Sequence, residues 1–418
     1  MLLMAAFLLS VSLAGQNSST AYSRFGIGRL YSNNNLLTMG MGGATYASRS
    51  NYFVNPFNPA SYTVFDSTSF VFDAAMQGKL TTLKTSTSSG KVNDAGLAYI
   101  TMGFPVTKWW KSSIGIMPYS SVNYQIEIDS IFDNLGKVRY GYTGSGGLNK
   151  AYIGNAFLPF KNLSVGFNFS YIFGTLNRDR TVFYPDSSNH FSSRITNSTI
   201  VRNMYLDFGL QYHTLLKNGL QVNAGLVFSP NQSLNSTRDF LAVTYYHDYT
   251  KNLDVNMDTA VYESGVDGKT VIPMLFGGGL SVGRANRWNI ASDFQYQDWT
   301  EFKAFGISDS LRKSFRISLG GQYKPSPLDV GKYWKRINYR AGVRFEKSFL
   351  ELRDQSLNEI GISFGVSLPM KKSRSTVNLS FETGTFGTTD NQLIKENFFR
   401  FTIGAALSER WFLKRKYD

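Results

Sequence analysis

The sequence contains no cysteine among its 418 residues and only three histidines. Without cysteine there is no thiol for a lipid anchor at the N-terminus, no disulfide and no thiolate metal site. The histidines, His190, His213 and His247, are not paired at the spacing that metal ligands need. We therefore expect neither a metal site nor a cofactor.

Long apolar runs are also missing beyond the first residues. No stretch reaches the roughly 18 apolar residues of a membrane-spanning helix, which excludes a helical membrane protein. Charged residues make up 17% of the chain and aromatic residues 15%, and 38 glycines stand against 11 prolines. The charged fraction is below the roughly 25% of typical soluble domains, and the balance favours many strands over helices.

Negative charge is in short supply, because 43 lysines and arginines face 29 acidic residues, a net charge of +14. The basic residues are scattered singly and form no stripe, which is not the pattern of a nucleic-acid interface. We expect anionic lipid headgroups as their counterpart, and no nucleic acid.

Residues 1–14 have the pattern of a secretory signal peptide. Leu2 to Val11 is a short apolar run, and Ser12-Leu13-Ala14 offers small residues where a signal peptidase reads. The usual basic start is missing, and the run is too short to span a bilayer. We expect these residues to take no part in the fold.

A stretch rich in glycine and proline precedes the first regular strand. Gly40-Met41-Gly42-Gly43-Ala44 allows close backbone approach, and the steps Asn55-Pro56 and Asn58-Pro59 force extended or turn geometry. The segment should be compact and irregular, either as a folded plug or as an ordinary surface loop. We favour the plug and assign residues 15–66 to it.

From Ser67 to the end, about fourteen segments alternate apolar and polar residues between turns, as in a transmembrane β-barrel. In one of them Tyr339, Ala341, Val343 and Phe345 share a face, while Arg340, Gly342, Arg344 and Glu346 share the other. The same period places four further apolar rows toward lipid: Phe315 to Tyr323, Val377 to Phe381, Leu163 to Phe173 and Phe399 to Leu407. We assign residues 67–418 to the barrel, an all-β fold.

A soluble sandwich would also alternate, but two features favour a barrel. Glycine recurs on the polar face, as at Gly361 and Gly365, where small inward residues would leave room for a plug. Aromatic residues also recur at strand ends, as in the girdles of a barrel. The tryptophans concerned are Trp109, Trp110, Trp288, Trp299, Trp334 and Trp411.

Two long polar stretches, 177–197 and 230–270, are expected to be irregular extracellular loops, because such barrels have short turns on the periplasmic side. Between them and the turns, we place the remaining strands approximately at 94–105, 112–127, 147–157, 200–215, 219–228, 272–282, 288–299, 359–368 and 397–407.

The order of these features resembles the FadL-like family of outer-membrane transport proteins. The resemblance covers most of the mature chain: the Gly-rich stretch, Asn-Pro-Ala before the first long strand, and the strands that follow. It implies a hatch inside the barrel and passage of small hydrophobic molecules with a lateral exit. The residues it places on the path or gate are Gly42, Gly43, Asn58, Pro59 and Ala60. Around them the chain departs from the family pattern at Ser50-Asn51 and Ser61-Tyr62.

Pro118 lies within the predicted strand 112–127. A proline in a central strand deletes a ladder hydrogen bond, so the wall should bend or part there. A kink in the corresponding strand of the family resembles a side door to the lipid, which adds Pro118 to the candidate gate.

Five charged residues fall at inward positions on several strands: Asp293, Arg316, Arg340, Arg344 and Glu382. Because unpaired charges in a filled lumen would be costly, we expect them to pair with one another or with the plug. A selectivity ring is the alternative.

Motifs for catalysis occur in the wrong context. Gly361-Ile362-Ser363-Phe364-Gly365 matches a hydrolase elbow but lies inside a strand. Gly268-Lys269-Thr270 lacks the earlier glycine of a phosphate loop. The stretch beginning at Asp254 resembles a calcium loop but has Thr259 and Gly265 where glycine and glutamate are needed. We expect no enzyme.

Three functions stay open from the sequence. The first is passage of small hydrophobic molecules through a monomeric barrel in the outer membrane of a Gram-negative bacterium. The second is a non-transporting subunit of a larger outer-membrane complex such as an assembly machine, and the third is an aqueous porin. The basic, aromatic tail would either anchor to headgroups or dock a membrane or periplasmic partner through Arg410, Lys414, Arg415 and Lys416.

Overall fold

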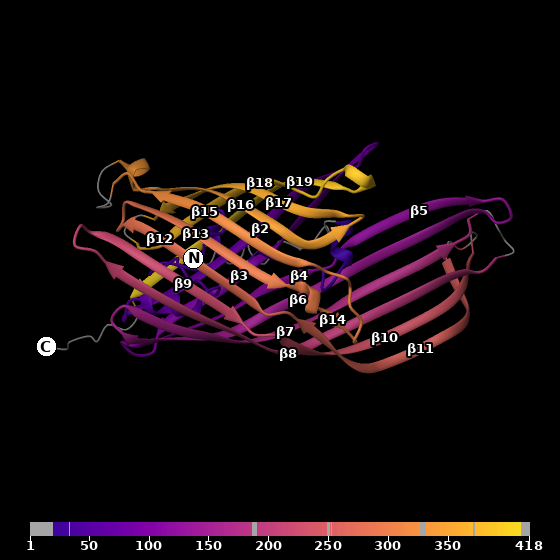
Figure 1. Ribbon diagram of the computed structural model, residues 1–418, viewed down its shortest axis with the longest axis horizontal. Helices are drawn as coiled ribbons and strands as arrows, with labels where there is room; N and C mark the ends of the chain where they lie inside the picture. Colours follow the sequence, from indigo (N-terminus) through magenta and orange to yellow (C-terminus); the bar gives the residue numbers. More distant parts are fainter. Residues whose placement is uncertain are drawn as a thin grey trace.

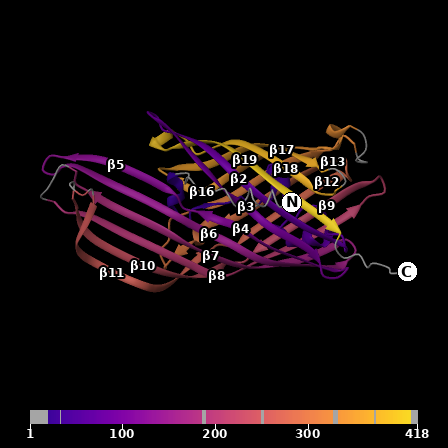
Figure 2. The same cartoon turned by 180° about the vertical axis from the view of Figure 1, so that it is seen from behind.

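The structure, a computed structural model, describes residues 20–32, 34–185, 190–248, 251, 253–326, 332–370 and 373–410. Their strands form one antiparallel sheet that closes on itself, with β19 paired to β2 (Figures 1 and 2). Three wall strands are each divided into two labelled parts, β4 with β5, β9 with β10, and β11 with β12, and β1 and β14 have two residues each. The fold is thus a closed barrel of 14 strands, which confirms the predicted class.

The wall strands are β2 (Ser69–Lys84), β3 (Ser89–Pro105), β4 (Trp110–Ser121), β5 (Tyr124–Phe132), β6 (Gly136–Phe160), β7 (Leu163–Phe183), β8 (Ser192–Leu215), β9 (Leu220–Ser229), β10 (Gln232–Asp248), β11 (Leu253–Ile272), β12 (Leu275–Arg284), β13 (Trp288–Asp298), β15 (Lys313–Tyr323), β16 (Asn338–Leu352), β17 (Gln355–Pro369), β18 (Thr376–Phe386) and β19 (Lys395–Arg410). The short elements are β1 (Arg29–Leu30), β14 (Lys303–Ala304), α2 (Leu36–Met39), η1 (Ala21–Arg24), η2 (Pro59–Val64), η3 (Trp299–Glu301), η4 (Tyr333–Arg336) and η5 (Asp390–Gln392).

The two faces of the wall follow the predicted alternation. In β16, Val343 is 47% exposed on the outside, whereas Arg344 is 4% exposed on the inside. In β7, Phe169 lies outside, and Ser164 and Asn168 are fully buried inside. This inversion, apolar outside and polar inside, suits a wall between lipid and a polar interior. No helix among the described residues is long and apolar enough to span a membrane.

The two rims of the barrel differ in height. The turns β6–β7, β8–β9 and β12–β13 at one rim are short, and both β2 and β19 have their outer chain ends there, so we assign this rim to the periplasm. At the opposite rim, one group of neighbouring strands continues well past the others (Figures 1 and 2). We call this part, in the order β5, β6, β7, β8, β10 and β11, the projecting sheet.

The projecting sheet corrects the prediction of two long irregular loops. Residues 177–183 and 192–197 continue β7 and β8, and 232–248 and 253–270 form β10 and most of β11. These segments are mostly polar, and residues 256–265 of β11 are exposed on both faces. Their sequence therefore shows no alternation and resembles that of a loop.

The predicted aromatic girdle is also corrected at one position. Trp109 and Trp334 are more than half exposed near the periplasmic rim, as a girdle requires. Trp299 is only 1% exposed, and its ring packs on Phe302 and Phe349 in an apolar cluster inside the extracellular end. Trp411 lies outside the described residues.

Candidate functional site in the barrel interior

Residues 20–66, which we call the N-terminal segment, contact the inward face of the wall over much of its circumference. Their local structure follows from single side chains. Asn35 caps α2 by accepting the N–H of Thr38, and Thr38 returns a bond to Asn35, so the four-residue helix is closed at its start. Asn58 caps η2 by accepting the N–H of Ala60, with Pro59 as its first residue. The predicted compact, irregular geometry is present.

The candidate gate residues lie at contacts with the wall. Gly42 and Gly43 have φ of +68° and +83°, a region that favours glycine. The Gly42 N–H donates to Ser363 Oγ on β17 at 2.8 Å. The Asn58 amide donates to the Tyr46 carbonyl at 2.7 Å and to the Leu210 carbonyl of β8 at 3.3 Å. These residues hold the N-terminal segment against separate parts of the wall.

Wall glycines make this close approach feasible. A methyl group at Gly225, Gly320 or Gly342 would overlap the backbone of Tyr46, Met41 or Gly42, because that backbone occupies the space of the missing side chain. We call the wall glycines whose missing side chain would meet the N-terminal segment the glycine belt: Gly103, Gly154, Gly166, Gly209, Gly225, Gly277, Gly279, Gly320, Gly342, Gly365 and Gly404. Of the two inward glycines named from the sequence, Gly361 and Gly365, the belt includes Gly365. A fit this close around the wall leaves little freedom for the segment to shift.

Asp293 on β13 anchors the residues that follow the Gly-rich stretch. Its carboxylate accepts the backbone N–H groups of Thr45 at 2.5 Å and of Tyr46 at 2.8 Å. The Tyr46 hydroxyl also donates to Gln295 on the same strand at 2.6 Å. A carboxylate that accepts two backbone amides in a buried site is a strong anchor.

A buried ion-pair network lies toward the extracellular half of the interior. Arg344 donates to Glu359 at 2.5 Å and to Glu382 at 2.6 Å. Glu382 also pairs with Arg400 at 2.6 Å, and Arg29 of the N-terminal segment bridges Glu359 and Glu396 at 2.7 and 2.6 Å. The sequence indicated Arg344 and Glu382, but it did not single out Arg29, Glu359, Glu396 or Arg400 as partners. Only the two-residue alternation, which places Glu359 and Glu396 on the inward face of their strands, could have indicated these partners.

The other two predicted arginines lie apart from this network's centre. Arg316 is buried and donates to Gln295 at 2.7 Å. Arg340 is also buried and donates to Gln322 at 2.8 Å and to Ser367 at 2.7 Å. The five predicted inward charges therefore do not meet in one ring.

A second contact region closes the extracellular end. Tyr22 and Ile27 of the N-terminal segment are buried in an apolar cluster with Trp299 and Phe386 of the wall region. The Tyr22 hydroxyl donates to the Ile394 carbonyl at 2.8 Å, and Thr20 bonds the Glu396 carboxylate. The N-terminal segment thus contacts the wall near both ends of the barrel.

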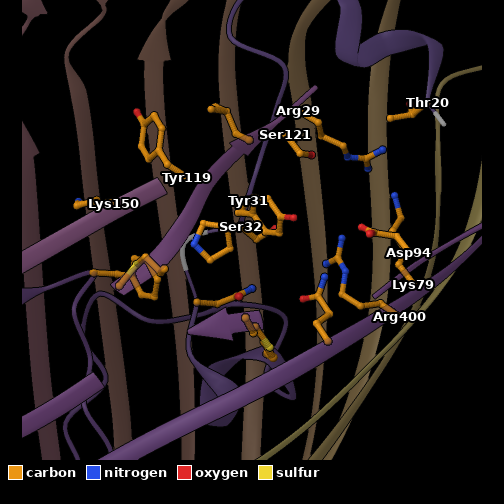
Figure 3. Close-up of a pocket in the computed structure, with 18 residues that line it drawn as sticks. Thr20, Arg29, Tyr31, Ser32, Lys79, Asp94, Tyr119, Ser121, Lys150 and Arg400 are labelled. Atoms are coloured by element: carbon orange, nitrogen blue, oxygen red, sulfur yellow. The ribbon is translucent and has the colours of Figure 1, made fainter. Parts of the chain in front are cut away.

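The cavities left between segment and wall are small. One of about 80 Å³, shown in Figure 3, is lined by Arg29, Lys79, Asp94 and Arg400 among others, and another has about 90 Å³. An apolar cavity that binds benzene has a volume of about 150 Å³. The cavities here are smaller and carry charged groups, which suits ordered water better than a hydrophobic molecule.

Strand pairing in the wall is interrupted beside Pro118. Pairing of β3 with β4 ends at Ile100 and Ile116, and a register shift follows Pro118 on the β6 side. Beyond this point the edge of β4 is met by β1, where Arg29 pairs with Ser121. The cavity of Figure 3 lies behind the gap, with Pro118 in its lining.

Ser363, the serine of the elbow-like motif, acts as an acceptor for the N-terminal segment. We expect Ser363→Ala to destabilise the folded barrel by about 1 kcal/mol, because the buried Gly42 N–H loses its partner. Ser318→Ala is the matched control, since the Ser318 hydroxyl is buried without a partner in the described part of the chain. Heat-dependent unfolding on gels compares the two variants, and an equal effect of both would contradict this role.

Acidic side chains outside the N-terminal contacts have other partners in the described part of the chain. No group of three or more metal-binding side chains occurs among these residues. Asp254, which begins the calcium-loop-like stretch, bonds Arg194 and His247 instead. Asp207, on the strand of His213, bonds Lys150 and Ser229.

Solved structures of similar fold include channels for hydrophobic compounds. The Pseudomonas putida toluene transporter TodX shares 14% identity with a TM-score of 0.59, covering 92% of this chain and 100% of that one. CymD, a monoaromatic hydrocarbon channel, shares 14% with a TM-score of 0.56, covering 93% and 100%. A FadL homologue of Pseudomonas aeruginosa shares 12% with a TM-score of 0.56, covering 91% and 98%. The barrel is FadL-like in fold, as predicted.

Sequence comparison adds the family. No curated protein sequence matches the chain. The sequence profile of one family, described as BamG, matches residues 1–418, the full length given. The chain belongs to the BamG family.

Proposed function

We propose that this protein is a non-conducting, structural subunit of a larger complex in the outer membrane of a Gram-negative bacterium. The observation that carries the proposal is the glycine belt, in which the N-terminal segment takes the place of side chains on ten wall strands. A gate must move within its barrel. A segment fitted to the wall in this way acts as a permanent filling that stiffens the barrel.

Two further observations support a structural role over transport. Arg29 and Asp293 join segment and wall through charged groups inside the barrel, and separating them would leave buried carboxylates unpaired. The family name, BamG, also suits the alternative of a subunit of an outer-membrane assembly machine. Such a barrel needs no catalytic residue.

Passage of small hydrophobic molecules is the second candidate. It is favoured by the parted wall at Pro118, with a cavity behind it, and by the fold shared with channels for hydrophobic compounds. It requires the N-terminal segment to move, because the cavities between this segment and the wall are too small. An aqueous porin is less well supported, since the interior is filled by the N-terminal segment.

A disulfide lock separates the two candidates. Thr63 Oγ1 of η2 lies 2.7 Å from Ser164 Oγ of β7, so Thr63→Cys/Ser164→Cys should form a bridge in a chain that has no other cysteine. In cells lacking the protein we expect the locked variant to restore growth and outer-membrane protein levels as fully as wild type. Deletion should leave uptake of a labelled long-chain fatty acid unchanged.

The same strains provide the control and the result that would contradict the structural role. Reduction of the disulfide should change nothing if the segment never moves. If deletion lowers uptake, and the locked variant restores it only after reduction, transport is the function. Affinity purification from native membranes should recover a stoichiometric companion under the proposed function.

The C-terminal tail stays a prediction as a docking or anchoring surface. Lys414, Arg415 and Lys416 lie outside the described residues, and Arg410 is the last residue of β19. Loss of the companion on neutralising Lys414 and Lys416 would support docking at the periplasmic side, and retention would support anchoring.

A further inference from the structure

The outer edge of β11 is the largest unpaired strand edge of the projecting sheet. β11 pairs with β10 from Leu253 to Ile272, but on its other side, among the described residues, only Thr270 and Val271 have strand partners, in β14. The backbone N–H and C=O groups along the rest of that edge have no strand partner among the described residues. Such an edge is a ready template for another chain.

Both faces of the same strand are uncovered. Residues 256–265 are exposed without interruption, so neither lumen nor lipid covers one side, unlike a barrel strand. Apolar side chains are among them, with Met257 51%, Val261 42% and Tyr262 70% exposed. An ordered strand that is open on three sides and carries apolar groups has the character of a binding surface.

The charge of this hairpin is opposite to that of the chain. Residues 232–272 contain six acidic and three basic residues, whereas the whole chain has a net charge of +14. Asp254 and Glu263 are neutralised by Arg194 and Arg238. Asp258 accepts only the Thr259 N–H, and Asp267 the Thr237 hydroxyl, within the described contacts. Two carboxylates at this edge are thus left without a cation.

At the opposite edge of the projecting sheet, formed by β5, acidic side chains are neutralised by basic side chains of β6. Asp129 bonds Arg139 at 2.8 Å and Lys137 at 2.9 Å across the β5–β6 hairpin. The hydrogen bond from Arg139 lowers the pKa of Asp129 to about 2. Charge therefore distinguishes the β11 edge as the one that can attract a partner.

The acidic charge of the β10–β11 hairpin also indicates what kind of partner can bind at the β11 edge. An anionic membrane surface would repel the hairpin, and pairing with β11 of a second copy would place like charges opposite each other. We propose that the β11 edge binds an extended segment of another outer-surface protein that carries lysine or arginine. This inference rests on the proposed function, because it assigns the companion's docking surface.

The geometry sets the size of that segment. Asp258 and Asp267 lie opposite Thr244 and Thr237 of β10, which are seven residues apart, about 23 Å along a strand. Register shifts at three places between β10 and β11 interrupt the ladder and twist the edge. Side-chain pairing with Asp258 and Asp267, and contact with Tyr262, therefore carry recognition more than a long backbone ladder does.

Hydrogen–deuterium exchange of the full chain tests the inference. We expect amides 256–265 to exchange roughly tenfold more slowly in isolated native outer membranes than in the detergent-purified protein, because the partner covers them. Asp258→Lys and Asp267→Lys, each alone, should abolish the protection. Asp133→Lys, an equal charge reversal at the exposed β5–β6 turn, should retain it.

Each outcome decides something. Equal exchange in membranes and detergent overturns the inference, and protection that survives both β11 substitutions overturns the basic partner. A photo-cross-linker at Tyr262 should give an adduct that either β11 substitution removes. If a companion co-purifies while β11 stays unprotected, the proposed function stands and only the docking surface is wrong. If no companion is found and no protection occurs, both fail.

Discussion

Replacing Gly225 and Gly342 by alanine is expected to dislodge the N-terminal segment from the wall. At both positions a methyl group would overlap backbone atoms, of Tyr46 and of Gly42, which cannot rotate away as a side chain would. Overpacking costs about 1–3 kcal/mol per site, and two sites on separate strands should add. We expect the double variant to unfold at a clearly lower temperature on heat-shift gels. A thiol introduced in that background by Thr63→Cys should become reactive to a maleimide.

The matched control is Gly321→Ala, one residue from the belt glycine Gly320 on the same strand. Its added methyl group would meet nothing closer than 3.7 Å. This variant should therefore keep the wild-type unfolding temperature, and the thiol introduced by Thr63→Cys should stay unreactive in it. If the double variant behaves like this control, the segment is not held by the belt, and the main support for a structural role is lost.

Replacing Arg344 by alanine is expected to have the second large effect. Arg344 is 4% exposed and is the shared partner of Glu359 and Glu382. Removing one member of a buried ion pair costs about 3–5 kcal/mol. Because Glu359 and Glu382 keep Arg29 and Arg400 as partners, we expect a loss at the lower end of this range. Denaturant-dependent unfolding of the purified barrel should show this loss.

A second substitution separates charge from packing. In Arg344→Ala/Glu346→Gln the carboxylate whose one described ion-pair partner is Arg344 becomes neutral, so we expect part of the stability to return. Arg139→Ala removes an arginine from exposed pairs with Asp129 and Glu127 and should cost no more than about 1 kcal/mol. An equal loss for Arg139→Ala and Arg344→Ala would show that burial does not matter to the network.

Under the proposed structural role, the filled interior has a simple purpose. An empty 14-stranded barrel would hold water and could deform under lateral load. A barrel filled by its own N-terminal segment behaves more like a packed core. The parted wall at Pro118 fits this picture because β1 of the same segment pairs with the free edge of β4. The N-terminal segment thereby pairs with the part of β4 that no longer pairs with β3 beyond Pro118.

Much of the wall could be predicted from the sequence. The alternation of Val343 with Arg344 assigns each side chain to lipid or interior, because a strand has a period of two and a shift by one residue would invert every contact. Pro118 indicated the parted wall for an equally local reason, a missing N–H. Gly42, Gly43 and Asn58 marked a compact segment through backbone conformations that few other residues adopt.

The tertiary structure alone decided what those elements meet. Arg29 and Glu359 are 330 positions apart, and their pairing depends on closure of the barrel and on the path of the segment inside it. The same holds for the glycine belt, since a glycine's neighbours cannot be read from its own strand. The projecting sheet escaped prediction because alternation records a difference between two environments. Where water lies on both sides of a strand that difference vanishes, and only pairing with the neighbouring strands makes it a strand.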